Sequence, residues 1–468
     1  MAERMQKFVS LGQKWPDKRP SEERAEDFHE IHREFIAQKA ADQAARCAQC
    51  GVPFCQTHCP LQNNIPDWLK LTAEGRLEDA YRLSASTNSM PEICGRICPQ
   101  DRLCEGACVI EQSGHGSVTI GAVEKYLTET AWKQGWVEPI RPRAERSETI
   151  GIIGAGPAGL AAAERMRQRG YQVTVYDRHD RVGGLLIYGI PNFKLEKDVV
   201  ERRTQRLIDG GVKFVLNCNV GQDISFDDLR AKHDAVLIAT GVYKAKPLNA
   251  PNERGVVPAL DFLIAANRVG LGDDVPEFTS GKLNAKGRRV VVIGGGDTAM
   301  DCVRTARRQG AESVTCLYRR DRANMPGSQR EVSHAEEEGV DFDWLAAPKS
   351  VRGGKAPAVK AVRMRLGAPD ASGRQSPEET SENYEVPGDL IIAALGFDAE
   401  DVSAWAETTR WGTIKADPFT YATNQAGVYA AGDIVRGASL VVWAIREGRD
   451  AADAMHAWIQ AQAKVAAE

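Results

Sequence analysis

Eight of the eleven cysteines of this 468-residue chain lie between residues 47 and 108. They form two strings, Cys47-x2-Cys50-x4-Cys55-x3-Cys59-Pro and Cys94-x3-Cys98-Pro-x4-Cys104-x3-Cys108. Thiolates at such short spacings bind zinc or iron–sulfur clusters. The other three, Cys218, Cys302 and Cys316, stand alone in the sequence, and we expect them to behave as small apolar side chains.

The spacing favours clusters over zinc. Structural zinc sites pair C-x2-C knuckles across a longer loop, and only Cys47 and Cys50 form such a knuckle. The first string instead approaches the ferredoxin pattern C-x2-C-x2-C-x3-C-P, with two extra residues in one gap. We therefore predict two [4Fe–4S] clusters held by all eight thiolates, with zinc and inert thiols as the alternatives.

Composition narrows the remaining function classes. Lys plus Arg is 60 and Asp plus Glu is 64, a formal net charge of −4, which does not suit a nucleic-acid-binding surface. No apolar run approaches the ~20 residues of a membrane span. The first 20 residues lack the apolar segment of a secretory signal. We expect a cytoplasmic protein without membrane or nucleic-acid partners, whose cysteines are not in disulfides.

The chain divides at a polar, proline-broken stretch over residues 138–147. Before it, we predict a helical domain over residues 1–147, with a charged helix across residues 21–46 and short helices over 66–75 and 121–132. After it, apolar strands alternate with glycine-rich turns and helices, which is typical of parallel α/β folds. We predict two Rossmann-like units, one from residues 148–280 and 405–468, the other from residues 281–404.

Each unit has a glycine-rich turn between a strand and a helix. The first reads Gly154-Ala-Gly156-Pro-Ala-Gly159, and the second reads Gly294-Gly-Gly296-Asp-Thr-Ala299. Such turns place a pyrophosphate on the N–H groups that begin the helix. A single G-x-G-x-x-G is a weak signal on its own. We predict two dinucleotide sites because each copy follows a strand and begins a helix.

The residues after the next strand distinguish the two dinucleotides. Asp177, 23 positions after Gly154, suits a ribose 2′-hydroxyl, as in FAD or NAD. Arg319 and Arg320 suit the 2′-phosphate of NADP, because a guanidinium matches phosphate oxygens. A solvated basic patch is the alternative for these arginines, and Asp321 is an alternative ribose ligand.

Two later strand ends assign FAD to the first unit. Residues 233–238 are an apolar strand that ends in Ala239-Thr240-Gly241, and residues 427–431 precede Gly432-Asp433. This pattern resembles the glutathione-reductase-like superfamily over roughly residues 148–460. The predicted FAD-binding residues are Gly154, Gly156, Pro157, Ala158, Gly159, Asp177, Arg178, Gly184, Leu185, Val220, Ala239, Thr240, Gly241, Gly432, Asp433, Ser439 and Leu440. The predicted NADP-binding residues are Gly294, Gly295, Gly296, Asp297, Thr298, Ala299, Arg319, Arg320 and Gly396.

The order of the parts resembles one family over the full length, the small (β) subunits of NADPH-dependent glutamate synthase. The motifs that carry the resemblance are Cys47-Ala-Gln-Cys50-Gly-Val-Pro-Phe-Cys55, Cys94-Gly-Arg-Ile-Cys98-Pro, Gly154-Ala-Gly-Pro-Ala-Gly159-Leu, Gly189-Ile-Pro-Asn-Phe-Lys194-Leu and Ala430-Ala-Gly-Asp433. The resemblance implies that NADPH is oxidised at FAD. Electrons then pass through the clusters to a large (α) subunit with FMN and amidotransferase sites, which makes glutamate from 2-oxoglutarate and glutamine.

The sequence leaves three points open: one ligand of the second cluster, the role of Lys194, and the final electron acceptor. A similar module in dihydropyrimidine dehydrogenase and in ferredoxin:NADP transhydrogenases implies one cluster on Cys47, Cys50, Cys55 and Cys108. It implies a second on Cys59, Cys98 and Cys104, with Glu124 in place of Cys94. Lys194 is a candidate to assist hydride transfer. The alternative functions are an NADPH reductase for ferredoxin or another acceptor, and a non-enzymatic scaffold, against which the intact glycines of both units argue.

Overall fold

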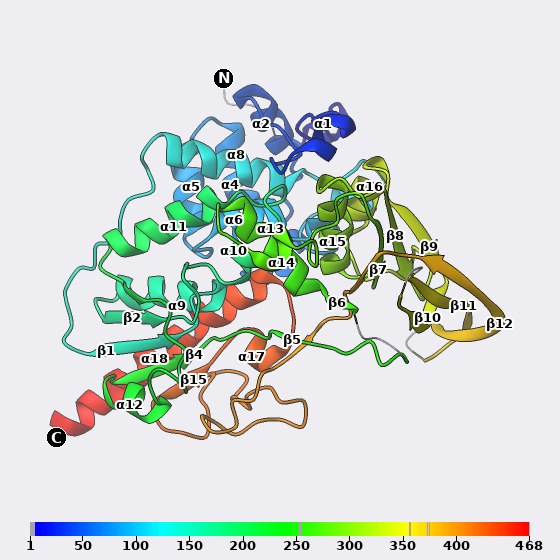
Figure 1. Ribbon diagram of the computed structural model, residues 1–468. Helices are drawn as coiled ribbons and strands as arrows, with labels where there is room; N and C mark the ends of the chain where they lie inside the picture. Colours follow the sequence, from blue (N-terminus) through cyan, green and yellow to red (C-terminus); the bar gives the residue numbers. More distant parts are fainter. Residues whose placement is uncertain (1–4, 252–254, 355–356, 372, 374, 468) are drawn as a thin grey trace.

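The computed structural model describes every residue except 1–4, 252–254, 355–356, 372, 374 and 468. Helices build the cysteine-rich domain, shown in blue in Figure 1, around a core that includes Trp68, Val123 and Leu127. Its helices are η1 (Lys7–Val9), α1 (Ser21–Glu26), α2 (Ala37–Ala44), α3 (Phe54–Thr57), α4 (Ile65–Ala73), α5 (Leu77–Ala85), α6 (Pro91–Ile97), η2 (Gln100–Arg102), α7 (Val109–Gln112) and α8 (Ile120–Lys133).

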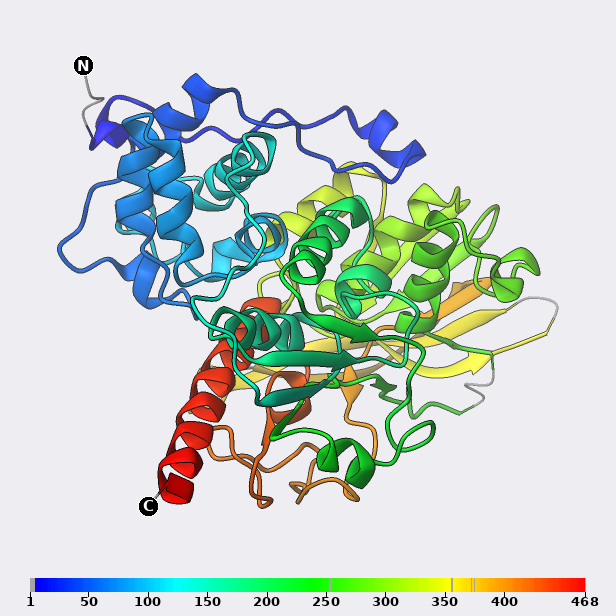
Figure 2. The same ribbon diagram turned by 90° about the vertical axis from the view of Figure 1, so that its left-hand side faces the viewer.

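The continuous helix predicted over residues 21–46 is wrong. Helix α1 ends at Glu26, and α2 begins only at Ala37. Asp27 interrupts the helix because its carboxylate accepts hydrogen bonds from the guanidinium of Arg19 at 2.8 Å and from the backbone N–H of His29 at 2.9 Å. Residues 27–36 therefore form an irregular segment that returns from α1, which contacts α15 of the second nucleotide unit, to α2 (Figure 2).

The first α/β unit is a parallel sheet in the order β15-β4-β1-β2-β3. Its strands are β1 (Thr149–Ile153), β2 (Gln172–Tyr176), β3 (Lys213–Val215), β4 (Ala235–Ile238) and β15 (Val428–Ala430). Its helices are α9 (Pro157–Gln168), α10 (Leu185–Tyr188), α11 (Lys197–Asp209), α12 (Phe226–Ala231), α17 (Asp433–Arg436) and α18 (Val441–Ala467). Helix α18 packs along α9 (Figure 1), and the carboxyl ends of β1, β4 and β15 meet at one edge.

The second unit repeats this architecture in the order β6-β13-β7-β8-β9, also parallel. Its strands are β6 (Val257–Pro258), β7 (Arg289–Ile293), β8 (Ser313–Tyr318), β9 (Asp341–Trp344) and β13 (Leu390–Ala393). Its helices are α13 (Ala259–Gly270), α14 (Pro276–Thr279), α15 (Asp297–Arg308) and α16 (Gln329–Glu337). An antiparallel sheet of β10 (Ala346–Arg352), β11 (Ala358–Pro369) and β12 (Gln375–Pro387) is inserted before β13.

The structure moves both predicted unit boundaries. Strand β6 pairs with β13, and Phe262 of α13 shares a core with Val290 and Met300, so the second unit begins at residue 257 rather than at 281. At its other end, Val402 already packs into the core of the first unit, before the predicted return at residue 405. The antiparallel pair β5 (Lys244–Ala245) and β14 (Phe397–Asp398) joins the two connections.

No helix within the described residues is both long enough and apolar enough to cross a bilayer.

Candidate functional site

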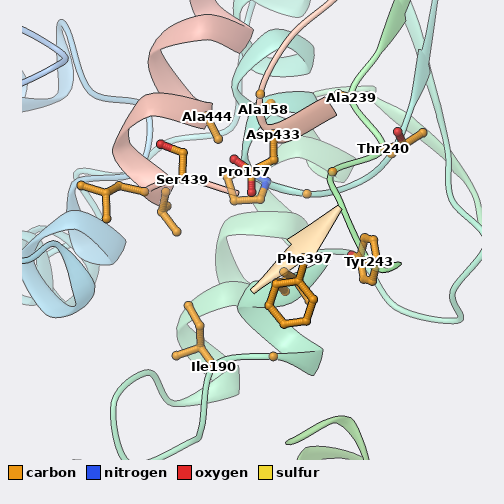
Figure 3. Close-up of a pocket in the computed structure, with 18 of the residues that line it drawn as sticks. Pro157, Ala158, Ile190, Ala239, Thr240, Tyr243, Phe397, Asp433, Ser439 and Ala444 are labelled. Carbon is orange, nitrogen blue, oxygen red and sulfur yellow. The ribbon is translucent and has the colours of Figure 1, made fainter. Parts of the chain in front are cut away.

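A cavity of about 220 Å³ opens where the carboxyl ends of β1, β4 and β15 meet (Figure 3). Thirteen of the predicted FAD-binding residues line it: Gly154, Gly156, Pro157, Ala158, Asp177, Leu185, Ala239, Thr240, Gly241, Gly432, Asp433, Ser439 and Leu440. Four do not line it. Gly159 packs α9 against the turn, Arg178 covers the ring of Tyr243 at 4.7 Å, Gly184 lies beside Gly156, and Val220 belongs to a neighbouring core.

The turn at the mouth of this cavity has the geometry of a dinucleotide site. Gly154 has φ +108°, and a Cβ there would lie 2.3 Å from the carbonyl oxygen of Ala239. Gly156 precedes α9, and no atom lies within 4 Å of the position that its Cβ would take, so a phosphate can approach the backbone. The buried Oγ1 of Thr240 has no hydrogen-bond partner within the described chain. The cavity therefore fits a dinucleotide that also brings polar groups.

Two carboxylates line this cavity. Asp177 accepts hydrogen bonds from the N–H of Ala155 at 2.7 Å and from that of His179 at 2.8 Å. Burial works against ionisation, but the bonds from His179 and Ala155 lower the pKa of Asp177, so this carboxylate is charged. Burial raises the pKa of Asp433 to about 7, and α18 begins eight residues later. The amino end of that helix favours negative charge.

Sequence reasoning missed several residues of this cavity. Tyr243 directly precedes β5, Phe397 is the first residue of β14, and Ile190 comes from the loop after α10 (Figure 3). Neither Tyr243 nor Phe397 belongs to a spaced motif. Ile190 lies in the motif Gly189-Ile-Pro-Asn-Phe-Lys194-Leu, which is the signal that could have indicated it.

A second cavity, of about 560 Å³, lies between the second unit, the first unit and the helical domain. Of the predicted NADP-binding residues, Asp297 and Thr298 line it. Gly294, Gly295 and Gly296 form the turn before these two residues, and Ala299 lies in the first turn of α15. A Cβ on Gly295 would lie 2.4 Å from the ring of Tyr318, whereas the Cβ position of Gly296 is open. Gly396 lies away from this cavity, where its carbonyl accepts a hydrogen bond from Lys246.

Arg319 and Arg320 follow β8, as the sequence predicts. No ion pair joins either guanidinium to a described residue, and the buried Nε of Arg320 has no hydrogen-bond partner there. Asp321 is engaged elsewhere, since its carboxylate accepts bonds from the backbone and side-chain nitrogens of Asn324 at 2.9 and 2.7 Å. The two arginines are therefore available to an anion, and Asp321 caps its own loop.

Lys194 lies where the two cavities meet. Its Nζ is 2.9 Å from Oδ1 of Asp301, which lines both cavities, and 3.5 Å from Oε2 of Glu331. Burial alone would lower the pKa of Lys194, but these two carboxylates raise it above its usual value. The amine is therefore a fixed positive charge at the junction.

The structure sorts the eight cysteines into two groups of four. One group, which we call the outer group, surrounds a small cavity and comprises Cys47, Cys50, Cys55 and Cys108. The other, the inner group, surrounds a second small cavity and comprises Cys59, Cys94, Cys98 and Cys104. No three His, Cys, Asp or Glu side chains of the described residues converge on one metal ion. Each set of four thiols instead lines one small cavity, as the ligands of a cluster would.

Both candidates for the eighth ligand belong to the inner group. Glu124 lines the same cavity, accepts a hydrogen bond from the hydroxyl of Ser84 at 3.3 Å, and burial raises its pKa to about 8. The Sγ of Cys94 lies 3.8 Å from Oδ1 of Asn88. Five donors thus surround the inner cavity, and the choice between Cys94 and Glu124 stays a prediction.

The four cavities form a connected series, in which Ile120 lines both the inner and the outer cysteine cavity. Val441 lines both nucleotide cavities, and the next residue, Val442, lines the inner cysteine cavity. Cys98 lines the inner cavity and the second nucleotide cavity. The first turn of α18 therefore separates the flavin-type site from the inner cysteines.

Comparison with known families covers both halves of the chain. A family described as dihydropyrimidine dehydrogenase domain II, 4Fe-4S cluster, matches residues 24–136, and one described as pyridine nucleotide-disulphide oxidoreductase matches residues 148–448. Among solved structures, FprA of Mycobacterium tuberculosis is similar in fold, with a TM-score of 0.60 and 20% identity over 69% of this chain and 86% of that chain. These matches confirm the fold class and the cofactors FAD, NADPH and 4Fe–4S, whereas the number of clusters stays a prediction.

The curated relatives match almost the whole chain. The glutamate synthase (NADPH) small chain of Azospirillum brasilense is 62% identical over 99% of this chain and 98% of that protein. That of Escherichia coli K12 is 44% identical over 98% of this chain and 100% of that protein. The putative oxidoreductase AegA of E. coli K12 is 45% identical over 98% of this chain but 71% of that protein. The chain belongs to the family of NADPH-dependent glutamate synthase small chains.

Proposed function

We propose that this chain oxidises NADPH and supplies the electrons to a large subunit that makes glutamate from 2-oxoglutarate and glutamine. Bound FAD would supply the change from two-electron hydride transfer to single electrons, and [4Fe–4S] clusters would supply single-electron transfer. The observation that supports this most is the contiguous series of cavities, from the nucleotide cavity through the flavin cavity and the inner cysteines to the outer ones.

The protein's part is to hold and orient the two nucleotides. Gly156 and the start of α9 would bind the FAD pyrophosphate, and Asp177 the ribose. The amino end of α18 would stabilise negative charge on the flavin side of the cavity. Lys194, a fixed cation between the two cavities, would orient polar groups there, while Ile190 and Phe397 exclude water.

The outer cysteines support a transfer of electrons to a partner at the surface. Phe54 and Val109 line their cavity and are 45% and 39% exposed, and Val52 in the same loop is 63% exposed. Cys50 and Cys55 are themselves only half-buried. An exposed apolar surface beside a redox group is suited to a protein partner. We propose that the large subunit covers this surface.

Anaerobic purification tests the cofactor part of the proposal. We expect ~1 FAD and ~8 non-haem irons per chain, from one flavin site and two cysteine groups. Chemical analysis of iron, labile sulfide and flavin measures this. Stoichiometric zinc without labile sulfide would contradict the cluster assignment.

Reconstitution tests the reaction. NADPH-dependent glutamate formation should require this chain, the large subunit, glutamine and 2-oxoglutarate together. A different acceptor is the second candidate, because the chain is also 45% and 43% identical to the putative oxidoreductases AegA and UacF of E. coli. NADPH oxidation that persists with ferredoxin, but yields no glutamate with the large subunit, would favour that second candidate.

A further inference from the structure

The helical domain reaches the nucleotide-binding turn of the second unit. Its turn η2 contributes Asp101 and Arg102 to this contact. The guanidinium of Arg102 lies 3.6 Å from the carboxylate of Asp297, the first residue of α15, and also donates a hydrogen bond to the carbonyl of Pro326. Asp101 accepts a hydrogen bond from the hydroxyl of Ser328 at 3.1 Å. A single turn of the iron–sulfur domain therefore touches both the start of α15 and the segment beside it.

That segment closes over the glycine turn. The N–H of Gly327 donates to the carbonyl of Gly295 at 3.0 Å, and the N–H of Ser328 donates to Oδ1 of Asp297 at 2.9 Å. Residues 325–328 thus lie against the turn that a pyrophosphate approaches, and the iron–sulfur domain holds them there from outside.

The charge of Asp297 poses a problem for a nucleotide. A carboxylate on the first residue of α15 lies at the helix end that binds phosphate, and it repels a dianionic pyrophosphate. The side chains of Asp297 and Arg102 are 37% and 40% exposed, so water screens their attraction only in part. Arg102 is the basic residue paired with this carboxylate.

We propose that the iron–sulfur domain completes the NADPH site through Arg102. This residue neutralises Asp297 and fixes the 325–328 segment, so that the N–H groups at the start of α15 stay free to bind the pyrophosphate. Arg102 is a positioning residue, and the inference rests on the proposed function of the second unit as the NADPH site. The pyrophosphate is common to NADPH and NADH. Arg102 should therefore raise the affinity for both nucleotides equally, whereas Arg319 and Arg320 should favour NADPH.

Calorimetric titration of the purified holoprotein with NADP⁺ and with NAD⁺ tests the proposal. Arg102→Gln should weaken both nucleotides by the same factor, about fivefold. Adding Asp297→Asn to that variant should restore most of the affinity, because the uncompensated charge is then gone. Arg76→Gln, an exposed arginine of the same domain paired with Asp79, is the matched control and should leave both affinities unchanged.

Each outcome is decisive. Unchanged binding by Arg102→Gln, a loss confined to NADP⁺, or no recovery in the double variant would overturn the proposal. If Arg102→Gln loses iron, the single variant Asp297→Asn tests the proposal instead, because it leaves the iron–sulfur domain intact. This variant should bind both nucleotides about threefold more tightly. Weaker binding would overturn the proposal. Wild-type protein that binds neither nucleotide would instead refute the proposed function.

Discussion

Arg319 and Arg320 carry the specificity for NADPH in our interpretation. Both follow β8 without an ion pair to a described residue. A charge-assisted bond to a 2′-phosphate contributes ~1.5–3 kcal/mol, so Arg320→Ala should raise the KM for NADPH roughly 10–150-fold and leave that for NADH nearly unchanged. Arg319→Ala should act in the same direction but less, because Arg319 is exposed. Steady-state kinetics with a small electron acceptor measures this, and equal losses with both nucleotides would indicate a structural patch.

The site residues were predictable from sequence where the bound group requires them at a fixed spacing. The glycines of both turns and all eight clustered cysteines could be found because a pyrophosphate or a cluster requires them at short intervals. Tyr243 and Phe397 could not, since they reach the flavin cavity from a connection without a motif. The grouping of Cys108 with Cys47 was predicted from the family resemblance and not from the spacing, because 60 residues separate the two in sequence.

Among the elements, α15, α16 and α1 meet at the buried carboxylate of Glu338. It accepts bonds from Arg304 at 2.9 Å, from Arg308 at 2.6 Å and from Arg24 at 3.3 Å. Burial alone would raise the pKa of Glu338, but Arg308 and Arg304 lower it to about 2. A lowered pKa means that the carboxylate stabilises the fold above its ordinary value near 4.5, and that this contribution is lost as the pH falls from there toward 2.

Glu338→Gln should therefore lower the free energy of unfolding by about 3–5 kcal/mol at pH 7, since it leaves buried guanidinium groups without their counter-charge. The difference in free energy of unfolding between Glu338→Gln and wild type should shrink below about pH 4.5. Urea unfolding at several pH values measures both effects. Glu336→Gln on α16, which removes an exposed pair with Arg322 of the loop after β8, should lower the free energy of unfolding by less than about 1 kcal/mol. If the free energy of unfolding of Glu338→Gln differed more from that of wild type at low pH, this would contradict a stabilising, ionised Glu338.

The elements themselves were predictable where apolar periodicity is strong. Strands β1, β7 and β8 follow the predicted apolar runs, because buried parallel strands are apolar throughout. The inserted sheet β10–β12 was not predicted, since the burial of β12 is limited to side chains such as Tyr384 and Val386 among many charged ones. The break at Asp27 depends on a hydrogen bond to Arg19, which no local pattern of charges reveals.

For the whole molecule, the iron–sulfur domain contacts both nucleotide units, and the inner cysteines lie beside the first turn of α18. Arg203 of the first unit pairs with the buried Glu92 of the helical domain at 2.6 Å, and Arg24 pairs with Glu337 of the second unit at 2.9 Å. The sequence indicates the three parts but not this arrangement, because the pairs that fix it join residues more than a hundred positions apart. We therefore expect electrons to pass from the flavin cavity through the inner cysteines to the outer group.

That route gives a prediction for the complete complex. Cys59→Ser should spare NADPH reduction of a small acceptor that reaches the flavin, because hydride transfer needs only the two nucleotides. The same variant should lose NADPH-driven glutamate formation with the large subunit. Cys218→Ser, outside both cysteine groups, is the control and should keep both activities. Because clusters contribute to folding, circular dichroism and association with the large subunit must be measured alongside. A folded, partner-bound Cys59→Ser protein that lacks a cluster yet makes glutamate at the normal rate would show that electrons do not pass through the inner group.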